Sequence, residues 1–329
     1  DFIRLGSQAA ILMIMPSSLK QFSKNNKMTS KETFDVIIVG GSYAGLAAAM
    51  ALGRAMKNVL IIDNGKPCNR QTPHSHNFLT NDGKKPAEIA AIASLQVSRY
   101  DTVKFFTGTA IEGNKTGAGF QIKMATGESF EGLKIIFATG IKDLLPAIEG
   151  LSECWGISVI HCPYCHGYEV RHEKTGILGN GDTGFEFTGL ISNWTKDLTL
   201  FSNGKAYLTS IQREKLQHNN VSIDEREIQR LIHNNGHLEE IIFKDGSSSS
   251  IKALYAPSPF EQHCKIPQQM GCGLTEEGYI AIDPFYETSV KGIFAVGDNA
   301  AKMRTVANAV AMGTSAGMMI SKKMIIDSF

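Results

Sequence analysis

The chain has 329 residues, of which 43% are hydrophobic and 20% are charged, and its formal net charge is +1. This length allows two domains of ordinary size, and the balanced charge gives no electrostatic argument for binding nucleic acid or an acidic membrane surface. No apolar run approaches the roughly 18–20 residues of a membrane-spanning helix. The composition therefore indicates a globular protein whose partners are neither nucleic acid nor membrane.

Residues 1–33 precede the first expected strand and differ in composition from the rest. A short apolar run at 9–15 is followed by a polar tract rich in Lys, Asn and Ser. A secretory leader can have an apolar region this short, but Asp1 precedes Arg4 and no clear small-residue cleavage site follows. We therefore expect 1–33 to be a disordered extension or one added by cloning, with Met28 as a plausible natural start.

Residues 34–63 follow the pattern of a dinucleotide-binding unit. The apolar run 34–39 predicts a buried strand, 46–54 predicts an Ala-rich helix, and a second strand at 59–62 ends on Asp63. The turn between the first strand and the helix consists of Gly40, Gly41, Ser42, Tyr43, Ala44 and Gly45. Its glycines let the backbone approach a pyrophosphate at a helix N-terminus, and the terminal acid holds a ribose hydroxyl.

The same unit recurs further along the chain with the same internal spacing. A strand at 175–178 leads into Gly179-x-Gly181-x-x-Gly184, a helix is expected over 185–194, and a strand follows at 198–201. The unit ends on Ser202, with no acid to hold a ribose diol, so its ligand is less defined than that of the first unit. Two such units predict two nucleotide sites.

A dithiol motif stands between the two units, in His161-Cys162-Pro163-Tyr164-Cys165-His166. A Cys-x-x-Cys pair lowers the pKa of one thiol, because the partner thiol and nearby dipoles stabilise the thiolate. A dithiol beside a dinucleotide fold indicates redox chemistry at sulfur. His166 is the candidate acid/base, since an imidazole can both take and give a proton near neutral pH. His161 is a weaker alternative, and a structural role for His166 stays open.

The six cysteines bear on the compartment and on metal binding. One tight pair and four scattered cysteines are typical of a reducing compartment, so we expect a cytoplasmic protein. A zinc site completed by Cys264 and Cys272 is disfavoured, because structural zinc usually takes a second close-spaced pair. We expect no metal site, and we expect these two cysteines, with Cys68 and Cys154, to be buried or idle thiols.

Two later segments complete the first domain. A strand is expected within 133–137, before the small-residue turn 138–140. A second strand at 292–296 would place Asp298 beside a bound cofactor, and a helix is expected over 305–324.

The predicted fold class is α/β, with two Rossmann-like three-layer domains, the second inserted in the first. The first domain spans 34–145 and 259–329, and the inserted domain spans 146–258. Pro146 and the segment 256–259 mark the crossovers, since Pro breaks helices and fixes the direction of the backbone.

Five signals occur in order: the turn 40–45, Ala138-Thr139-Gly140, Cys162-x-x-Cys165, the turn 179–184 and Gly297-Asp298. Together they resemble the low-molecular-weight thioredoxin reductase family of FAD-dependent disulfide oxidoreductases, over nearly everything from Phe34 on. The resemblance implies FAD in the first domain, a nicotinamide nucleotide (NADPH) in the inserted domain, and a homodimer. It also implies a rotation of the two domains that brings the dithiol to the flavin in one state and to substrate in the other.

The resemblance assigns roles residue by residue. The FAD contacts that it implies are Gly40, Ser42, Tyr43, Ala44, Gly45, Asp63, Asn77, Gly297, Asp298, Arg304 and Thr305. The NAD(P) contacts are Gly179, Gly181, Gly184 and Lys205. By resemblance, Cys165 exchanges electrons with the flavin, and Cys162 forms the mixed disulfide with substrate. Tyr43 either covers the cofactor or packs against its own helix.

Three departures from the family pattern bear on function. His166 stands where the typical reductase has an acid, and Lys205 is the only cation near the position of the usual His-Arg-Arg cluster that grips NADPH. Thr305 follows Arg304 where the family usually has an Arg-Gln pair near the flavin. In addition, Glu169 and Val170 stand where relatives that handle thioredoxin carry aromatic residues, which leaves the protein partner open. The segment Cys-Pro-Tyr-Cys-His-Gly-Tyr-Glu, which begins at Cys162, is similar to the motif of flavin-dependent dithiol oxidases that form disulfides in natural products.

Three functions follow from these observations. The first is a reductase that passes electrons from NAD(P)H through FAD and Cys162/Cys165 to a thioredoxin-like protein or a small-molecule disulfide; the intact turn at Gly179 favours it. The second is an oxidase that passes electrons from a small-molecule or protein dithiol through the same pair and FAD to oxygen; His166 and the missing arginines favour it. The third, a flavin redox sensor, is disfavoured because the site is complete.

Overall fold

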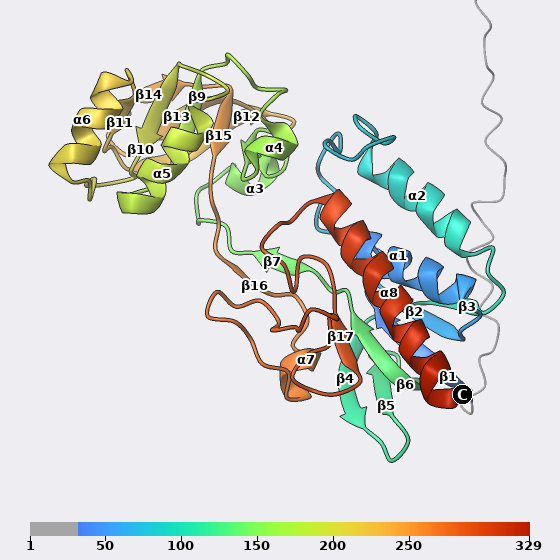
Figure 1. Cartoon of the computed structure of the whole chain (residues 1–329). Helices are drawn as coiled ribbons and strands as arrows, with labels where there is room; N and C mark the ends of the chain where they lie inside the picture. The colour runs from blue at the N-terminus through green and yellow to red at the C-terminus, as the bar shows by residue number, and fades with distance from the viewer. Residues whose placement is uncertain (1–31) are drawn as a thin grey trace, which may run out of the picture.

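We analysed a computed structural model, which describes residues 32–329 (Figure 1). Nearly all of the predicted extension, including Met28, therefore lies outside the described residues. Its last position, Thr33, already belongs to the first strand. No helix in the described part of the chain is long and apolar enough to cross a membrane.

The first domain is built on a seven-stranded sheet. Its strands are β3 (Val103–Thr107), β2 (Val59–Asp63), β1 (Thr33–Val39), β6 (Ser129–Phe137), β5 (Phe120–Met124), β4 (Ala110–Lys115) and β17 (Ile293–Ala295). The strands β3, β2, β1, β6 and β17 pair in parallel, whereas β5 and β4 continue antiparallel from the start of β6. Parallel strands are covered on both faces, which is why β1 and β2 are nearly continuous apolar runs.

Helices α1 (Tyr43–Arg54) and α8 (Val306–Ser328) run side by side against this sheet, with α2 (Pro86–Val97) beside them (Figure 1). Their backbones approach closely because small residues stand at the contact. A Cβ atom on Gly313 would lie 2.1 Å from the Ala44 carbonyl oxygen, and one on Gly317 would lie 2.6 Å from that of Ala48. This contact fixes α1, and with it the first glycine turn.

The inserted domain contains two sheets. The first is parallel and has the order β11 (Ser222–Asp224), β10 (Leu198–Phe201), β9 (Thr175–Leu178), β15 (Ala253–Tyr255) and β8 (Val159–Ile160). The second is antiparallel: β12 (Ile228–Asn234), β13 (His237–Phe243) and β14 (Ser248–Ser250). Its helices are α3 (Leu151–Cys154), α4 (Pro163–His166), α5 (Gly181–Ile191) and α6 (Ser210–His218).

Two short strands join the domains. The chain leaves the first domain along β7 (Ile141–Asp143) and returns along β16 (Phe260–Gln262), and the two pair antiparallel with Asp143 opposite Phe260 (Figure 1). Pro146 follows β7, and the segment 256–259 precedes β16. After β16 the short helix α7 (Ile266–Gln269) packs near β4.

The α/β class with two Rossmann-like units is confirmed. The helix expected over 185–194 is α5, which begins earlier, at Gly181, because Asn180 caps its N-terminus. The expected strand within 133–137 is longer, since β6 begins at Ser129 to pair with β5. Sequence analysis did not foresee the antiparallel strands, because their alternating patterns are short and carry no motif.

The α1–α8 contact gives a stability test. In Gly313→Ala the new Cβ would clash with the Ala44 backbone, so the helices must separate, and we expect the free energy of unfolding to fall by about 1–3 kcal/mol in urea denaturation. Gly189 in α5 is the control, because its Cβ would meet nothing within 4 Å. Gly189→Ala should leave stability unchanged or raise it by up to about 1 kcal/mol. Equal losses in both variants would contradict the proposed contact.

Candidate active site between the two domains

A cavity of about 1000 Å³ lies between the first domain and the dithiol segment of the inserted domain. The first glycine turn and Asp63 line one part of it, and Asp298 and Arg304 line another. Cys165 lines it from the inserted domain. The fold therefore brings together residues that are more than 200 positions apart in the sequence.

The first glycine turn presents an open helix N-terminus to this cavity. Gly40 has φ +109°, a conformation that L side chains rarely adopt, and a Cβ on Gly45 would lie 1.8 Å from the Gly40 carbonyl oxygen. Ser42 is the N-cap of α1, but its side chain makes no capping hydrogen bond. The free N–H groups at this end favour an anion such as a pyrophosphate. Gly45 itself lies beneath the turn and does not line the cavity.

Asp63 ties the turn to the loop that follows β2. Its Oδ2 accepts a hydrogen bond from the Gly41 N–H at 2.6 Å, and its Oδ1 accepts one from the Gly65 N–H at 2.7 Å. A carboxylate has about four acceptor sites, so two remain for the hydroxyls of a ribose.

Asp298 and Arg304 lie in a buried charged cluster. Burial raises the pKa of the Asp298 carboxyl to about 6, and the nearby Arg304 partly offsets this rise. The Arg304 Nη1 donates to Asp143 Oδ1 at 2.9 Å, which ties the start of α8 to the linker strand β7. Thr305 caps α8, with its Oγ1 accepting from the Asn308 N–H at 3.1 Å. Gly297 also lines the cavity.

An unsatisfied polar atom in the cavity wall tests whether a cofactor fits. Asn69 donates from Nδ2 to the Tyr43 hydroxyl at 3.3 Å, but its Oδ1 is buried with no hydrogen-bond partner in the described part of the chain. The Tyr43 hydroxyl donates in turn to the Pro86 carbonyl at 3.3 Å, so Tyr43 both lines the cavity and is held by α2. The uncapped N-terminus of α1, the Asp63 carboxylate and the unpaired Asn69 Oδ1 are groups that fit a dinucleotide such as FAD. Sequence analysis missed Asn69, which belongs to no motif.

Asn77 takes a different position from its sequence neighbours. It is exposed, has φ +58°, and donates its backbone N–H to Asp82 Oδ1 at 2.7 Å. It does not line the cavity, whereas His74, Ser75 and His76 just before it do.

The two cysteines of the motif are joined in a disulfide, with Cα atoms 5.3 Å apart. Cys162 is the N-cap of α4 and Cys165 lies one turn later, where Cys165 and His166 both donate their N–H groups to the Cys162 carbonyl. Cys165 lines the cavity and Cys162 does not. Cys165 is therefore the sulfur that faces the space for the cofactor.

The two histidines that flank the dithiol also line the cavity. Burial lowers the pKa of His166 to about 4, with a smaller contribution from nearby His76. Burial likewise lowers the pKa of His161 to about 3, and the His161 ring stacks on Trp155 with centroids 5.5 Å apart. Both imidazoles are neutral at pH 7, and a neutral imidazole can accept a hydrogen bond from an incoming thiol.

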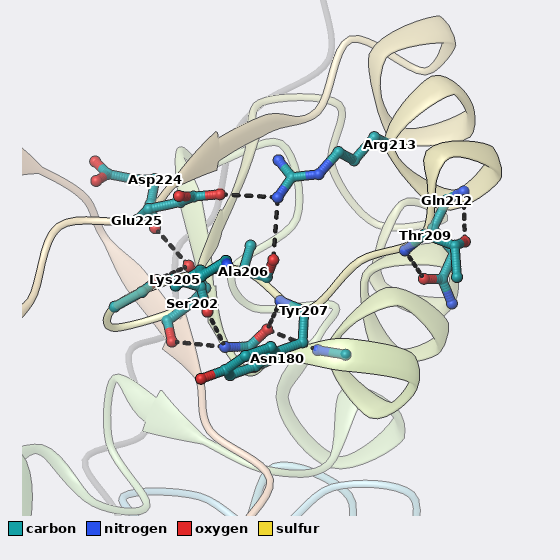
Figure 2. Close-up of polar contacts among 12 residues, drawn as sticks. Asn180, Ser202, Lys205, Ala206, Tyr207, Thr209, Gln212, Arg213, Asp224 and Glu225 are labelled. Carbon is teal, nitrogen blue, oxygen red and sulfur yellow. Dashed lines mark hydrogen bonds and ion pairs between the residues drawn. The ribbon is translucent and has the colours of Figure 1, made fainter.

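The second glycine turn differs from the first because a side chain fills it (Figure 2). The Asn180 Oδ1 accepts from the N–H groups of Gly181 and Tyr207, both at 2.8 Å. Its Nδ2 donates to the carbonyls of Ser202 at 3.3 Å and Lys205 at 2.9 Å. All donors and acceptors of this amide are used. Asn180 thus caps a backbone N–H that would face a pyrophosphate, and it ties the loop after β10 across the turn.

The cations near this loop are not arranged to hold a phosphate. Lys205 is exposed. Arg213 of α6 donates to Glu225 Oε1 at 2.9 Å and to the Ala206 carbonyl at 3.0 Å, as Figure 2 shows. Gly179 and Gly184 pack as in a dinucleotide unit, since a Cβ on Gly184 would lie 2.8 Å from the Gly179 carbonyl carbon. The unit keeps its backbone shape, while the Gly181 N–H and the Arg213 guanidinium are engaged within the protein.

Comparison with known proteins identifies the family. The family model "Pyridine nucleotide-disulphide oxidoreductase" matches residues 34–313. The chain belongs to this family. A thioredoxin reductase of Claviceps purpurea, tcpT, is 32% identical over 311 residues, which cover 91% of this chain and 97% of that protein. A second, sirT of Leptosphaeria maculans, is 32% identical over 88% of this chain and 94% of its own length.

Solved structures agree with this assignment. A putative thioredoxin reductase from Bacillus anthracis has a TM-score of 0.86 at 29% identity, covering 90% of this chain and all of that one. An oxidoreductase from Agrobacterium tumefaciens has a TM-score of 0.84 at 34% identity, covering 90% of this chain and 99% of that one. The resemblance to thioredoxin reductases is thereby confirmed: this member of the family is an FAD-dependent thiol–disulfide oxidoreductase.

The described residues hold no group of three or more His, Cys, Asp or Glu side chains arranged to bind a metal ion. The four remaining cysteines are free thiols. Cys68 is exposed at the wall of the open cavity rather than buried, and partial removal from water first, and then the Asp298 carboxylate, raise the pKa of its thiol. This thiol therefore stays protonated at neutral pH.

The partly buried imidazole of His166, with its lowered pKa, predicts how stability depends on pH. Between pH 6.5 and about 4 the unfolded chain binds a proton at His166 that the folded protein does not bind, so the free energy of unfolding falls as the pH falls. Between pH 7 and pH 5, the free energy of unfolding measured with urea should fall by about 1–2 kcal/mol more in the wild type than in His166→Asn. His218→Asn, at the exposed end of α6, is the control and should keep the wild-type loss. Equal losses in all three proteins would mean that His166 is hydrated.

Proposed function

We propose that the protein oxidises dithiols: a substrate dithiol is converted to a disulfide by the Cys162–Cys165 pair, and the electrons leave through FAD to oxygen. The observation that carries this proposal is the second glycine turn. Asn180 engages the Gly181 N–H, one of the groups at this helix end that a nicotinamide nucleotide would need for its pyrophosphate, and Arg213 of the adjoining region is paired with Glu225. A reductase needs that nucleotide as its electron donor, whereas a dithiol oxidase does not.

The chemistry at sulfur follows from the two cysteines. A substrate thiolate attacks Cys162, the enzyme disulfide breaks, and Cys165 leaves as a thiolate on the cavity side. The second substrate thiol then attacks the mixed disulfide, which releases the substrate disulfide and leaves two enzyme thiols. Neutral His166 can accept a hydrogen bond from the incoming thiol, whose proton is lost to solvent before attack. FAD, when bound, supplies a two-electron acceptor that oxygen can reoxidise, with hydrogen peroxide as the reduced product.

The groups that we propose to hold FAD are those of the first domain. They are the open N-terminus of α1 for a pyrophosphate, Asp63 for a ribose, and Asp298 with Asn69 toward the remaining part of the cofactor. The substrate class is a thioredoxin-like protein or a small-molecule dithiol. The homodimer and the cytoplasmic location stay predictions.

A reductase is the second candidate. The backbone of the second unit keeps the close approach of Gly179 and Gly184, and similar proteins are named thioredoxin reductases. In that case a nicotinamide nucleotide would have to displace the Asn180 side chain from the Gly181 N–H.

Flavin absorbance distinguishes the two functions. The FAD-loaded protein is mixed without oxygen with NADPH, NADH or dithiothreitol, and the flavin band is followed with time. We expect dithiothreitol to bleach the band at least about 100-fold faster than either nucleotide, and air then to restore it with hydrogen peroxide formed. This margin corresponds to about 3 kcal/mol in activation free energy. Bleaching by a nucleotide at the dithiol rate would establish the reductase instead.

A cysteine variant tests the sulfur step. Cys165→Ser should bind FAD normally but lose dithiol-dependent bleaching by at least about 1000-fold, because the hydroxyl cannot form the disulfide or accept electrons. Cys272→Ser is the matched control: this buried thiol lies outside the cavity beside the Thr288 hydroxyl at 3.3 Å, which can bond the new hydroxyl. It should keep the wild-type rate. Bleaching at the wild-type rate in Cys165→Ser would refute transfer through the pair.

A further inference from the structure

Glu169, four positions after Cys165, connects the dithiol segment to the first domain. Its Oε1 lies 3.5 Å from His76 Nε2, and the other ring nitrogen of His76 lies 3.6 Å from Asp82 Oδ2. His76 thus lies between one carboxylate of its own domain and one of the inserted domain. The neighbouring titratable groups are His166, which His76 influences electrostatically, and His74, whose ring centroid lies 6.3 Å from that of His76.

Few polar contacts hold the inserted domain in this orientation. Within residues 32–329, the His76–Glu169 contact is the only contact between a carboxylate and a His, Lys or Arg side chain that joins the bodies of the two domains, and it is an ion pair when His76 is protonated. One long hydrogen bond accompanies it, from Gln71 Nε2 to the Ser152 carbonyl at 3.5 Å. The covalent connection is limited to the neighbouring strands β7 and β16. Domains joined this lightly are expected to move relative to one another, so an ion pair at their contact can set the orientation.

Glu169 also has a second potential partner inside its own domain. Tyr255, at the end of β15, is completely buried, and its hydroxyl has no hydrogen-bond partner in the described part of the chain. Burial raises the pKa of this hydroxyl, and the negative charge of Glu169 raises it further. A buried hydroxyl without a partner is unfavourable, and a carboxylate that turned toward it would satisfy it.

We propose that Glu169 is a positioning residue with two alternative partners. Paired with His76 it holds Cys165 at the cavity, and paired with the Tyr255 hydroxyl it stabilises the orientation in which the dithiol has turned away toward substrate. The inference rests on the proposed function, because it concerns how one cysteine pair lies at the cavity in one orientation and meets a substrate dithiol in the other. It adds a residue to which sequence analysis gave no role at the site.

Thiol accessibility in the FAD-loaded protein tests the inference without measuring turnover. The disulfide is reduced with a phosphine under anaerobic conditions, and alkylation by iodoacetamide is followed separately at Cys165 and Cys162 by peptide mass spectrometry. In Glu169→Gln, alkylation of Cys165 should rise about two- to fivefold relative to Cys162, the range expected for loss of a partly exposed ion pair. His76→Asn should give the same rise from the other domain, and the double variant should rise no further.

Three further variants separate positioning from a general structural effect. Glu169→Asp should restore most of the protection of Cys165. Tyr255→Phe should change accessibility in the opposite direction, because it removes the partner of the outward orientation and keeps the His76 pair. Glu112→Gln is the control: Glu112 pairs with Lys123 at 3.7 Å, both half-exposed and in the first domain, and its loss should leave Cys165 unchanged.

Wild-type alkylation of Cys165 in both Glu169→Gln and His76→Asn would overturn the inference. Additive effects in the double variant would do the same, because the two residues would then act independently. If Glu169→Gln does not fold with FAD bound, His76→Asn and Tyr255→Phe decide the question. Alkylation needs neither a substrate nor oxygen, so the alkylation results can support the positioning role even where the bleaching experiment refutes the oxidase.

Discussion

The site depends on how two short strands connect the domains. β7 and β16 lie side by side, so the chain leaves and re-enters the first domain at one place, and the inserted domain is covalently attached at that place alone. Arg304, at the start of α8, is ion-paired with Asp143 at the end of β7. This arrangement brings the dithiol segment over a cavity whose floor belongs to the first domain. A motif in one domain and the cavity-lining groups of the other thereby form one candidate site.

Full or partial removal from water is the main electrostatic influence on this site. It lowers the pKa of His161 and His166 and raises that of Asp298 and Cys68, which are the directions expected when a charged form is removed from water. The two imidazoles are consequently neutral, and Cys68 keeps its proton. The reactive sulfurs are confined to the Cys162–Cys165 pair, with neutral imidazoles beside it that can accept hydrogen bonds.

The two glycine turns show how one motif can serve different purposes. In the first, the Ser42 side chain leaves the end of α1 uncapped, and the turn opens on the cavity. In the second, Asn180 satisfies its own helix end and binds the loop after β10. The backbone glycines are alike, so the pattern of glycines alone does not distinguish an open turn from a filled one. The difference lies in one side chain and in where its four hydrogen bonds go.

The sequence alone determined the elements that local patterns define. The apolar runs of β1, β2, β9 and β10, the glycine turns and the Cys-x-x-Cys pair predicted two Rossmann-like units and redox chemistry at sulfur, because strand burial and turn geometry depend on residues close together in the chain. Tertiary structure decided the rest. The Asn180 contacts reach residues 22 to 27 positions away, and the His76–Glu169 pair joins two domains, and no local pattern encodes such separations. The orphaned Asn69 Oδ1 and Tyr255 hydroxyl likewise became visible only in the fold, because an atom is buried or unpaired only with respect to everything that packs around it.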